Sequence, residues 1–419
     1  MIPKLDEYKK KWEVESDQII KPGLGAIRSA LKKLNNPQEH LNIVHIAGTN
    51  GKGSTLTFLE QISKQHGLTV GKFMSPCIVD VHDQIQINGQ AISEKELNSI
   101  FKQMKNANLS GMLTDFELLT CAAFLHFYQQ EVDLVLLETG MGGREDSTNV
   151  VTPIVSIITS IALEHTRFLG PTIKSIASHK AGIIKEGRPI IIGKLPEEAL
   201  YVVEQEAYEK HAPLIKLGDH FNIDCTNEFG DIYTNDENGL YINDLKRSLP
   251  GEHQGDNMAL AITALFEVAK YFQLPVDIEK IREGVKHATL PGRFEQVYPN
   301  IYFDGAHNPA SAIKLAETIR QQFPNEVIRF VIGMLADKDV KSVLRTFETV
   351  SEEFYFVDFM NERAMKAEDM LSLSNASSKQ IVKDYIPFLQ SCINRNGKTI
   401  VTGSLYLLAE IREALLNKY

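Results

Sequence analysis

Residues 48–54 read Gly-Thr-Asn-Gly-Lys-Gly-Ser, a glycine-rich segment with one lysine and one hydroxyl group suited to phosphate chemistry. Glycines let a backbone approach an anion closely, and the free N–H groups at a helix start attract phosphate. In such a segment Lys52 reaches the β- and γ-phosphates, and the Ser54 hydroxyl reaches a magnesium ion. Its spacing departs from the common P-loop, because two residues rather than four separate the first two glycines. The segment predicts a nucleotide triphosphate site; the alternative is a glycine-rich turn without a ligand.

Two further side chains with metal-binding chemistry follow apolar runs. Glu138 ends the run 133–137, and a glycine-rich turn comes next. A carboxylate at the carboxyl end of a parallel strand, beside a phosphate loop, is placed to hold magnesium directly or through water. His165 follows the run 154–160, in a strand predicted to lie next to that of Glu138. A solvated acid and a structural histidine are the alternatives, and the shared location favours a metal site.

These residues need a sheet to bring them together, and the chain carries the pattern of one. Apolar strand-like runs in the first half lie at 41–47, 70–74, 133–138, 153–161 and 189–193. They alternate with helical periodicity, which includes residues 55–65 directly after the glycine-rich segment. Residues 219–250 change to short, polar-interrupted runs that predict a small antiparallel insertion before a helix that follows Gly255.

A second alternation begins after residues 291–293. Its strand-like runs lie at 300–303, 327–333, 354–358 and 398–402, and its helical stretches at 309–323, 340–350, 381–394 and from about 405. The whole pattern predicts an α/β protein. We expect residues 1–295 to form a P-loop-type domain with a mostly parallel sheet and the small insertion, and residues 296–419 to form a Rossmann-like α/β domain. We expect the active site between the two domains, where ligands commonly bind.

Bulk composition favours a small-molecule enzyme. The 419 residues include 44 Lys and Arg against 54 Asp and Glu, a net charge of −10 that disfavours nucleic acid and anionic membranes as partners. The four cysteines are widely spaced, which argues against a disulfide framework or a zinc site. The N-terminus lacks the apolar core of a signal peptide, and we find no membrane span. We therefore expect a cytoplasmic protein and, without an exposed heptad, a monomer.

A series of short motifs runs in order over nearly the whole chain. The motifs lie at 47–55, 138–149, 180–183, 253–257, 291–293, 304–309, 337–339 and 403–406. Together they resemble the folylpolyglutamate synthase/dihydrofolate synthase family, a branch of the Mur ligase superfamily. Each motif alone is weakly specific, whereas their order and spacing are highly specific. The resemblance implies an ATP-dependent ligase that adds L-glutamate to the carboxylate of a folate or dihydropteroate through an acyl phosphate.

The resemblance also implies a set of site residues. Residues 1–295 would be the ATP-binding Mur ligase central-type domain, and residues 296–419 the glutamate-ligase domain. The site residues that would contact ATP are Gly51, Lys52, Gly53, Ser54, Asn257, Arg293 and Asp304. Those that would hold Mg²⁺ are Ser54, Ser75, Glu138 and His165. Those that would contact the pterin-bearing substrate are Thr114, Asp115, Phe116, Glu117, Glu145, Asp146 and Ser147. Lys180 matches a lysine carried as a carbamate, an anion able to support magnesium. With Lys52 and His165, we expect Lys180, Asp304 and His307 to serve catalysis, the last two in the glutamate step.

The chain departs from the family pattern at a few positions. The family usually has Asp at the position of Glu164, Glu at that of His179, His at that of Cys77, and Glu-Arg at that of Asp83-Gln84. The first two adjoin the metal site and bear on how His165 and Lys180 are oriented. The others adjoin the folate site and bear on which acceptor is used. A Mur-type cell-wall ligase and a nucleotide-binding relative without synthetic activity are the competing interpretations.

Overall fold

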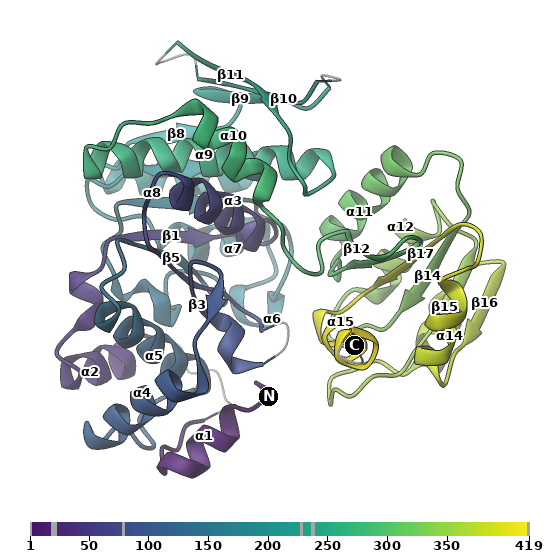
Figure 1. Ribbon diagram of the computed structural model, residues 1–419, viewed down its shortest axis with the longest axis horizontal. Helices are drawn as coiled ribbons and strands as arrows, with labels where there is room; N and C mark the ends of the chain where they lie inside the picture. Colours follow the sequence, from purple (N-terminus) through teal and green to yellow (C-terminus); the bar gives the residue numbers. More distant parts are fainter. Residues whose placement is uncertain (1, 18–22, 78–79, 227–228, 236–238, 417–419) are drawn as a thin grey trace. The chain divides into compact units, whose positions relative to one another are not determined.

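A computed structural model describes residues 2–17, 23–77, 80–226, 229–235 and 239–416 (Figure 1). The chain divides into two compact units: Met1–Ser248 with Gln254–Ala288, and Leu249–His253 with Thr289–Tyr419. The boundary predicted after residue 295 lies a few residues beyond this division, and the domain assignment stays a prediction. Among the described residues, no helix is both long enough and apolar enough to cross a lipid bilayer.

The first unit is built on an eight-stranded sheet with the order β4-β3-β2-β5-β1-β6-β7-β8. Its strands are β1 (Ile43–Ala47), β2 (Val70–Phe73), β3 (Ile85–Ile87), β4 (Gln90–Ala91), β5 (Leu134–Glu138), β6 (Val155–Ile158), β7 (Ile190–Ile192) and β8 (Leu214–Lys216). The six strands β2, β5, β1, β6, β7 and β8, in that order across the sheet, run parallel to one another. Strands β3 and β4 add an antiparallel edge beside β2. Strands β1, β5 and β6 are buried on both faces, as their apolar runs predicted.

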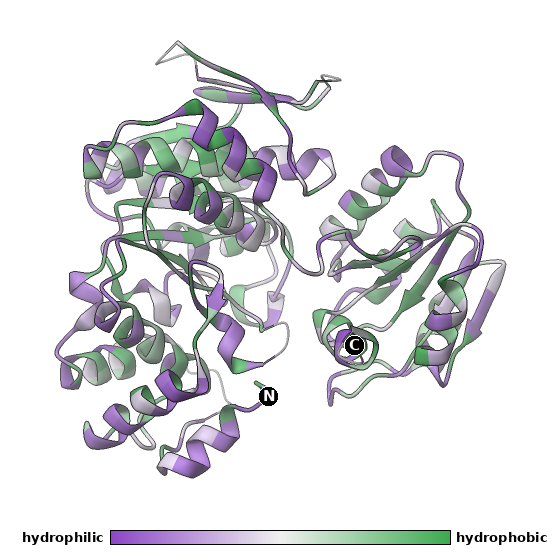
Figure 2. Cartoon of the chain, in the orientation of Figure 1, coloured by the Kyte–Doolittle hydropathy of each residue, from purple (hydrophilic) through white to green (hydrophobic). Residues whose placement is uncertain are grey.

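Helices cover both faces of this sheet. The helices of the first unit are α1 (Leu5–Trp12), α2 (Gly25–Lys33), α3 (Lys52–Gln65), α4 (Glu94–Asn106), α5 (Asp115–Gln129), α6 (Thr166–Leu169), α7 (Ile173–Ala181), α8 (Glu197–Glu209), α9 (Glu252–Phe272, whose first two residues belong to the second unit) and α10 (Ile278–His287). Single turns of 3-10 helix are η1 (Pro37–His40), η2 (Val81–Gln84) and η3 (Ser147–Val150). Alternate strand residues, such as Ile43 and Val135, pack with α2, α4 and α5, whereas α3 contacts β1, β2 and β5 and packs on α10. The colouring in Figure 2 shows the sheet strands as mainly hydrophobic.

The predicted insertion is present as a small antiparallel sheet with the order β11-β10-β9. Its strands are β9 (Phe221–Asp224), β10 (Asp231–Asn235) and β11 (Leu240–Leu245). The prediction that the next helix follows Gly255 is wrong, because α9 begins at Glu252 and contains Gly255. A side chain at Gly255 would meet the Cys225 sulfur at 2.2 Å, so a glycine inside the helix lets this segment pack closely.

The second unit is a six-stranded sheet with the order β12-β13-β17-β14-β15-β16. Its strands are β12 (Glu295–Tyr298), β13 (Ile301–Asp304), β14 (Ile328–Ile332), β15 (Glu353–Phe356), β16 (Ser378–Ile381) and β17 (Lys398–Thr402). Its helices are α11 (Pro309–Gln322), α12 (Val340–Phe347), α13 (Ala367–Leu373), α14 (Tyr385–Cys392) and α15 (Leu405–Leu416). All strands except β12 run parallel, which together with the first unit confirms the predicted α/β fold.

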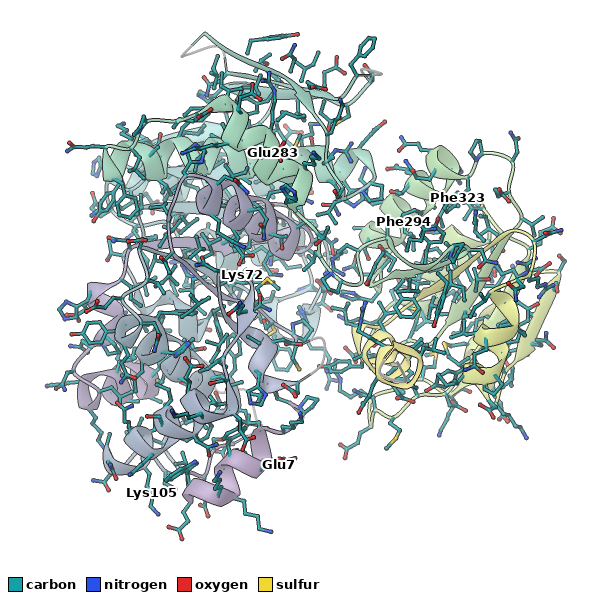
Figure 3. All side chains as sticks on the ribbon, in the orientation of Figure 1. Glu7, Lys72, Lys105, Glu283, Phe294 and Phe323 are labelled. Atoms are coloured by element: carbon teal, nitrogen blue, oxygen red, sulfur yellow. The ribbon has the colours of Figure 1, made fainter. Side chains whose placement is uncertain are left out.

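Aromatic side chains fill much of the core of the second unit. Phe294 and Phe323 lie side by side (Figure 3), with ring centroids 5.7 Å apart. The predicted helix 381–394 is wrong at its start, because residue 381 ends the edge strand β16 and the helix begins at Tyr385. Sequence patterns missed β16 and α13, since the residues of β16 are mostly exposed and show no apolar alternation.

Candidate active site

The glycine-rich segment joins the centre of the first sheet to a helix. Strand β1 lies between β5 and β6, and Ile46 pairs with Glu138 in the neighbouring strand. The prediction that the strand before His165 lies next to that of Glu138 is therefore wrong, because β1 separates β6 from β5. The carboxyl ends of these three parallel strands therefore meet at one edge, where residues 48–51 form a loop and α3 begins at Lys52. The unpaired N–H groups of the first turn of α3 face the loop, an arrangement that favours an anion.

Two glycines of the loop leave no room for a side chain. A Cβ atom at Gly48 would lie 1.9 Å from Oγ1 of Thr159, and one at Gly51 would lie 2.4 Å from Oδ1 of Asn257. Gly51 also has a φ of 90°, which a residue with a side chain rarely adopts. Asn257 is held by a hydrogen bond from its Nδ2 to Gln254 Oε1 of 3.0 Å. The loop thus touches α9 directly, with Asn257 against its backbone.

We expect Gly51→Ala to weaken binding of a non-hydrolysable ATP analogue by at least about tenfold, because the methyl group clashes with Asn257 and forces the loop to shift. Isothermal titration calorimetry measures the change. Gly67→Ala is the matched control, since Gly67 lies just past the far end of the same helix with a φ of 89°, and an added methyl group there would meet no atom within 4 Å. Equal affinity losses in both variants would contradict a role for the clash.

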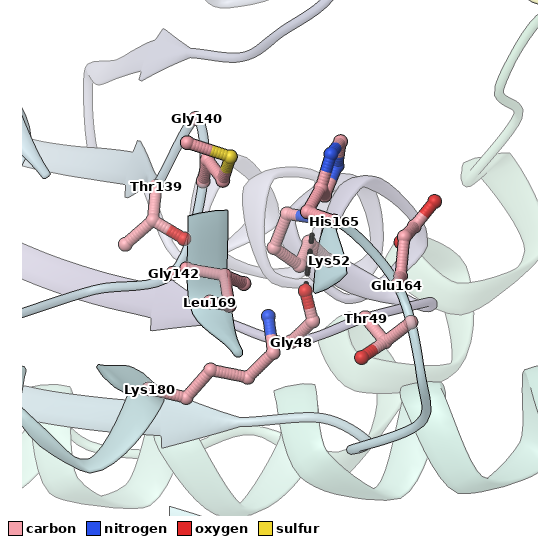
Figure 4. A pocket seen from close by; sticks show the side chains of 11 residues that line it. Gly48, Thr49, Lys52, Thr139, Gly140, Gly142, Glu164, His165, Leu169 and Lys180 are labelled. Atoms are coloured by element: carbon pink, nitrogen blue, oxygen red, sulfur yellow. Dashed lines mark hydrogen bonds between the residues drawn. The ribbon is translucent and has the colours of Figure 1, made fainter. Parts of the chain in front are cut away.

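One pocket at this edge includes three of the predicted site residues, Lys52, His165 and Lys180 (Figure 4). It is lined by Gly48, Thr49, Lys52, Thr139, Gly140, Met141, Gly142, Glu164, His165, Leu169 and Lys180. Lys52 lies within this pocket, and its Nζ donates a hydrogen bond to Gly48 O at 3.1 Å. The same Nζ lies 3.5 Å from Oε1 of Glu138. His165 is exposed and has a φ of 52°, at the start of the short helix α6. The structure therefore brings Lys52, Glu138, His165 and Lys180 to the same edge of the sheet.

Lys180 is buried at this pocket, with 4% of its surface exposed. Burial, and after it the charge of Lys52, lowers the pKa of Lys180 to about 7, although Glu164 and Asp146 act in the opposite direction. Close packing of the turn after β5 against the end of α7 places the lysine here. A Cβ atom at Gly143 would lie 2.8 Å from His179 O, which accepts a hydrogen bond from Arg144 N at 2.7 Å. At neutral pH a large share of Lys180 is an uncharged amine.

A chain of hydrogen bonds that sequence reasoning missed runs from β1 to the turn after β5. His45 Nε2 lies 2.9 Å from Oγ1 of Thr148, and that hydroxyl donates to Oδ1 of Asp146 at 2.5 Å. Oδ2 of Asp146 accepts from Met141 N at 2.8 Å. Burial lowers the pKa of His45 to about 3, so the imidazole is neutral, and burial raises the pKa of Asp146. The sequence feature that could have indicated this chain of hydrogen bonds is a histidine, His45, inside the apolar run 43–47.

The residues predicted to contact the pterin-bearing substrate divide into two groups. Thr114 and Glu117 form a capping box at the start of α5, with Glu117 Oε2 accepting from Thr114 N at 2.8 Å. Oδ1 of Asp115 accepts from Lys9 Nζ at 2.8 Å and from Ser16 Oγ at 2.5 Å. These polar groups are buried and hold the fold together locally.

Phe116 and its surroundings differ from that group. Its ring stacks on Phe73 with centroids 5.6 Å apart, and a Cβ atom at Gly140 would lie 2.6 Å from its ring. The ring is therefore a flat apolar surface beside the turn that lines the pocket. Ser147 Oγ lies 3.3 Å from Thr120 Oγ1 in the buried part of this region, whereas Glu145 is exposed.

Ser75 lies just after β2 and is partly buried, next to a cis Ser75–Pro76 peptide bond. The pocket lining does not include it. Ser54 lies in the first turn of α3 and is 2% exposed, and Glu138 is 5% exposed. Two oxygen donors of the predicted metal set are thus buried at the glycine-rich loop.

In the second unit, the predicted residues surround the turn after β13. Oδ2 of Asp304 accepts from Phe294 N and Oδ1 from Ala306 N, both at 2.9 Å. Burial raises the pKa of Asp304, and Arg293 opposes this. The Arg293 guanidinium lies against Gly305, where a Cβ atom would be 2.4 Å from Nη1. His307 Nδ1 lies 2.8 Å from Gly305 O. Asp304 therefore joins two backbone segments in this structure.

Both units match known families. Residues 46–265 match the Mur ligase middle domain, and residues 294–415 match the dihydrofolate synthetase C-terminal domain. The chain is 39% identical to the dihydrofolate synthase/folylpolyglutamate synthase of Bacillus subtilis, over 94% of this chain and 95% of that protein. It is 32% identical to the folylpolyglutamate synthase of Lacticaseibacillus casei, over 93% of this chain and 94% of that protein.

Solved structures agree with these sequence relations. E. coli FolC in complex with DHPP and ADP superposes with a TM-score of 0.90 and 30% identity, over 99% of this chain and 98% of that one. A structure described as an FPGS–AMPPCP complex superposes with a TM-score of 0.84 and 29% identity, over 98% of this chain and 99% of that one.

Proposed function

Because the chain belongs to the dihydrofolate synthase/folylpolyglutamate synthase family, a branch of the Mur ligases, we propose that its phosphate loop and pocket carry out ATP-dependent addition of L-glutamate to a folate. These family matches confirm the resemblance seen in the sequence, and the chain is an ATP-dependent ligase. The observation that carries the residue assignment is the convergence of Lys52, Glu138, His165 and Lys180 at one edge of the sheet.

The reaction has two steps. The γ-phosphoryl group of ATP passes to a carboxylate oxygen of the acceptor, giving an acyl phosphate and ADP. The amine nitrogen of L-glutamate then attacks the acyl carbon, loses a proton and displaces phosphate, which leaves an amide. The transferring phosphoryl group carries its charge on its equatorial oxygens, so positioning and charge stabilisation supply most of the catalysis. We propose that Lys52 and the backbone N–H groups of residues 51–54 position the phosphoryl group and stabilise its charge.

Further contacts to ATP come from the other predicted residues. We propose that Asn257, beside Gly51, contacts the nucleotide from α9. In the second unit, the forked guanidinium of Arg293 suits a phosphate, and we propose that Asp304 also contributes to this nucleotide site. For the glutamate step we propose Asp304 and His307, because Asp304 ends β13 and His307 lies in the turn that leads to α11.

The residues at the loop fit magnesium. Ser54 and Glu138 supply a buried hydroxyl and a buried carboxylate, and Mg²⁺ is commonly held by one or two carboxylates with substrate phosphates and water completing its shell. The described residues contain no group of three or more His, Cys, Asp or Glu side chains that would hold a metal by themselves, which agrees with such an open site. We propose that Ser54, Ser75, Glu138 and His165 hold Mg²⁺, which would neutralise phosphate charge when bound.

The environment of Lys180 supports the proposed carbamate. A neutral amine attacks the carbon of CO₂, an N–C bond forms and a proton is lost, so the reaction needs an uncharged lysine. Burial and the charge of Lys52 supply one, with a pKa of about 7. The product is an anion, which would attract a cation where an ammonium group would repel it. Glu164 and His179, which depart from the family pattern, both lie near Lys180 and do not remove this lysine from the pocket.

For the acceptor we propose the region around Phe116, where the ring of a pterin would find a flat apolar surface. Thr114, Asp115 and Glu117 shape the start of α5 beneath it, and Asp146 and Ser147 lie buried nearby. The exposed Glu145 completes the proposed set. Folate and dihydropteroate are both candidates, and we propose that either serves as the acid substrate.

The test of the function is ADP release from purified protein with ATP and Mg²⁺. We expect release only when a folate-type acid and L-glutamate are both present, because the acyl phosphate turns over only when the amine attacks it. Parallel assays with dihydropteroate and with reduced folates identify the acceptor. A rate that responds to a nucleotide-sugar peptide instead would favour a cell-wall ligase, and binding without ADP release would favour a relative that lacks synthesis.

We also propose that the protein acts as a monomer in the cytoplasm, as composition suggested. All four cysteines are free thiols in the structure, three of them buried, which agrees with a reducing compartment. Sedimentation at several protein concentrations tests the monomer.

A further inference from the structure

The phosphate loop is joined to the segment after β6 by two reciprocal hydroxyl contacts. Ser160 Oγ accepts a hydrogen bond from Asn50 N at 3.0 Å and donates to Asn50 O at 2.9 Å. Thr49 Oγ1 accepts from Ala162 N at 3.0 Å and donates to Ala162 O at 3.2 Å. Each hydroxyl thus bridges the N–H and the C=O of a single residue on the opposite segment. We call this pair of contacts the hydroxyl clasp.

Additional contacts make the clasp tight. Thr49 N donates to Ser160 O at 2.8 Å, and Thr159 Oγ1 donates to Asn50 O at 2.6 Å. Thr159 fills the space that a side chain at Gly48 would need. Thr49 is 7% exposed and Thr159 is 5% exposed, so water has little access to these two side chains, whereas Ser160 is partly exposed.

The clasp connects two parts of the pocket with different tasks. Residues 48–50 lead into the loop that we assign to the triphosphate, and residues 160–162 lead directly into Glu164 and His165. Segments joined by several partly buried hydrogen bonds tend to move together. A displacement of the loop by a bound nucleotide is therefore transmitted to the chain that carries His165.

We propose that Thr49 and Ser160 are positioning residues that couple nucleotide binding at the phosphate loop to the order of residues 160–166. This inference rests on the proposed nucleotide site and adds the route by which a filled site orders the segment of His165. Neither hydroxyl has to touch the nucleotide for this role, because both are engaged with backbone groups of the opposite segment.

Hydrogen–deuterium exchange with and without AMPPCP and Mg²⁺ tests the coupling. In the wild-type protein we expect the analogue to slow exchange in peptides covering 48–54 and 160–166. In Thr49→Val, which keeps the shape of the side chain and removes the hydroxyl, we expect slowing to persist at 48–54. At 160–166 we expect the slowing to fall by at least about fivefold, because the substitution removes both hydrogen bonds of the hydroxyl and the loss of one alone has an effect of this size. Thr49→Ser keeps the hydroxyl and is expected to restore wild-type behaviour.

Thr263→Val is the matched control, because Thr263 is also buried and its hydroxyl lies 3.0 Å from Tyr233 OH, outside the pocket lining. We expect it to retain slowing in both peptides. Ser160→Ala removes the other half of the clasp and is expected to behave like Thr49→Val. Combining the two substitutions should then add little at 160–166, because either one already breaks the coupling.

The outcomes separate the coupling from the proposed function. Slowing at 160–166 in Thr49→Val equal to that of the wild type would overturn the coupling and leave the nucleotide site intact. A similar loss in Thr263→Val would overturn it as well, since general destabilisation would explain both variants. An absence of slowing at 48–54 in the wild type would overturn the proposed nucleotide site and the coupling with it.

Discussion

Lys52→Ala is expected to lower kcat/KM by roughly 10²-fold or more, equivalent to about 3 kcal/mol of transition-state stabilisation, by analogy with the removal of one oxyanion donor. The ammonium group lies in the pocket, 3.1 Å from Gly48 O and 3.5 Å from Oε1 of Glu138. Among the described residues that line the pocket, no other supplies a lasting positive charge at this point, since Lys180 is partly neutral. Steady-state kinetics with saturating acceptor and L-glutamate measure the loss.

The kinetic loss in Lys52→Ala can be attributed to the lysine only if the variant is folded. Lys64→Ala is the control on the same helix, because Lys64 is partly exposed and its Nζ donates to Asn88 O at 3.0 Å, away from the pocket. We expect near-normal turnover in that variant and an unchanged melting temperature in both. Turnover of Lys52→Ala close to that of the wild type would remove the lysine from the reaction.

Lys180→Ala is expected to lower kcat/KM by about 10- to 100-fold, the range seen when a group that supports a metal site is removed. The loss should appear mainly as a higher Mg²⁺ requirement, because the proposed carbamate supports the metal rather than the acceptor. Titrating Mg²⁺ at fixed ATP separates the two effects. Lys174→Ala, an exposed lysine on the same helix, is the control and should leave the Mg²⁺ requirement unchanged.

The carbamate also predicts a response to pH and to CO₂. Wild-type protein stripped of CO₂ should lose activity and regain it with bicarbonate, whereas Lys180→Ala should not respond. The pKa of Lys180 is lowered to about 7, so the ammonium form dominates below that pH and cannot attack CO₂. At a constant concentration of dissolved CO₂, recovery should therefore slow by roughly tenfold for each pH unit below 7. Recovery independent of bicarbonate would rule out the modification.

The sequence predicts the parts of this site that are encoded by neighbouring residues, such as a motif or an apolar run. The loop at 48–54 is recognisable because glycines, a lysine and a hydroxyl group coincide between an apolar run and a helical pattern. Glu138 and His165 follow apolar runs that the structure shows as the neighbours of β1. A sheet that is parallel and buried on both faces produces continuous apolar runs, so the chain itself reveals which residues end its strands.

Contacts between hydroxyl groups and distant backbone carry no such signal. Thr49 and Ala162 are 113 positions apart, and a lone threonine gives no hint of its partner. The same holds for His45 and Thr148, which meet only because η3 returns to β1. For α5, the Thr114-to-Glu117 spacing fits both a substrate motif and a capping box, and the structure shows the capping box.

The two hydrogen bonds of Asp304 affect how mutagenesis of the second unit is to be read. One carboxylate oxygen faces Phe294 N–H and the other faces Ala306 N–H. An asparagine would turn an NH₂ group toward one of those donors, and an alanine would abandon both, so each replacement disturbs the chain on either side of β13. Inactivity of an Asp304 variant is consequently ambiguous evidence for chemistry, and a calorimetric scan has to accompany every rate measured at this position.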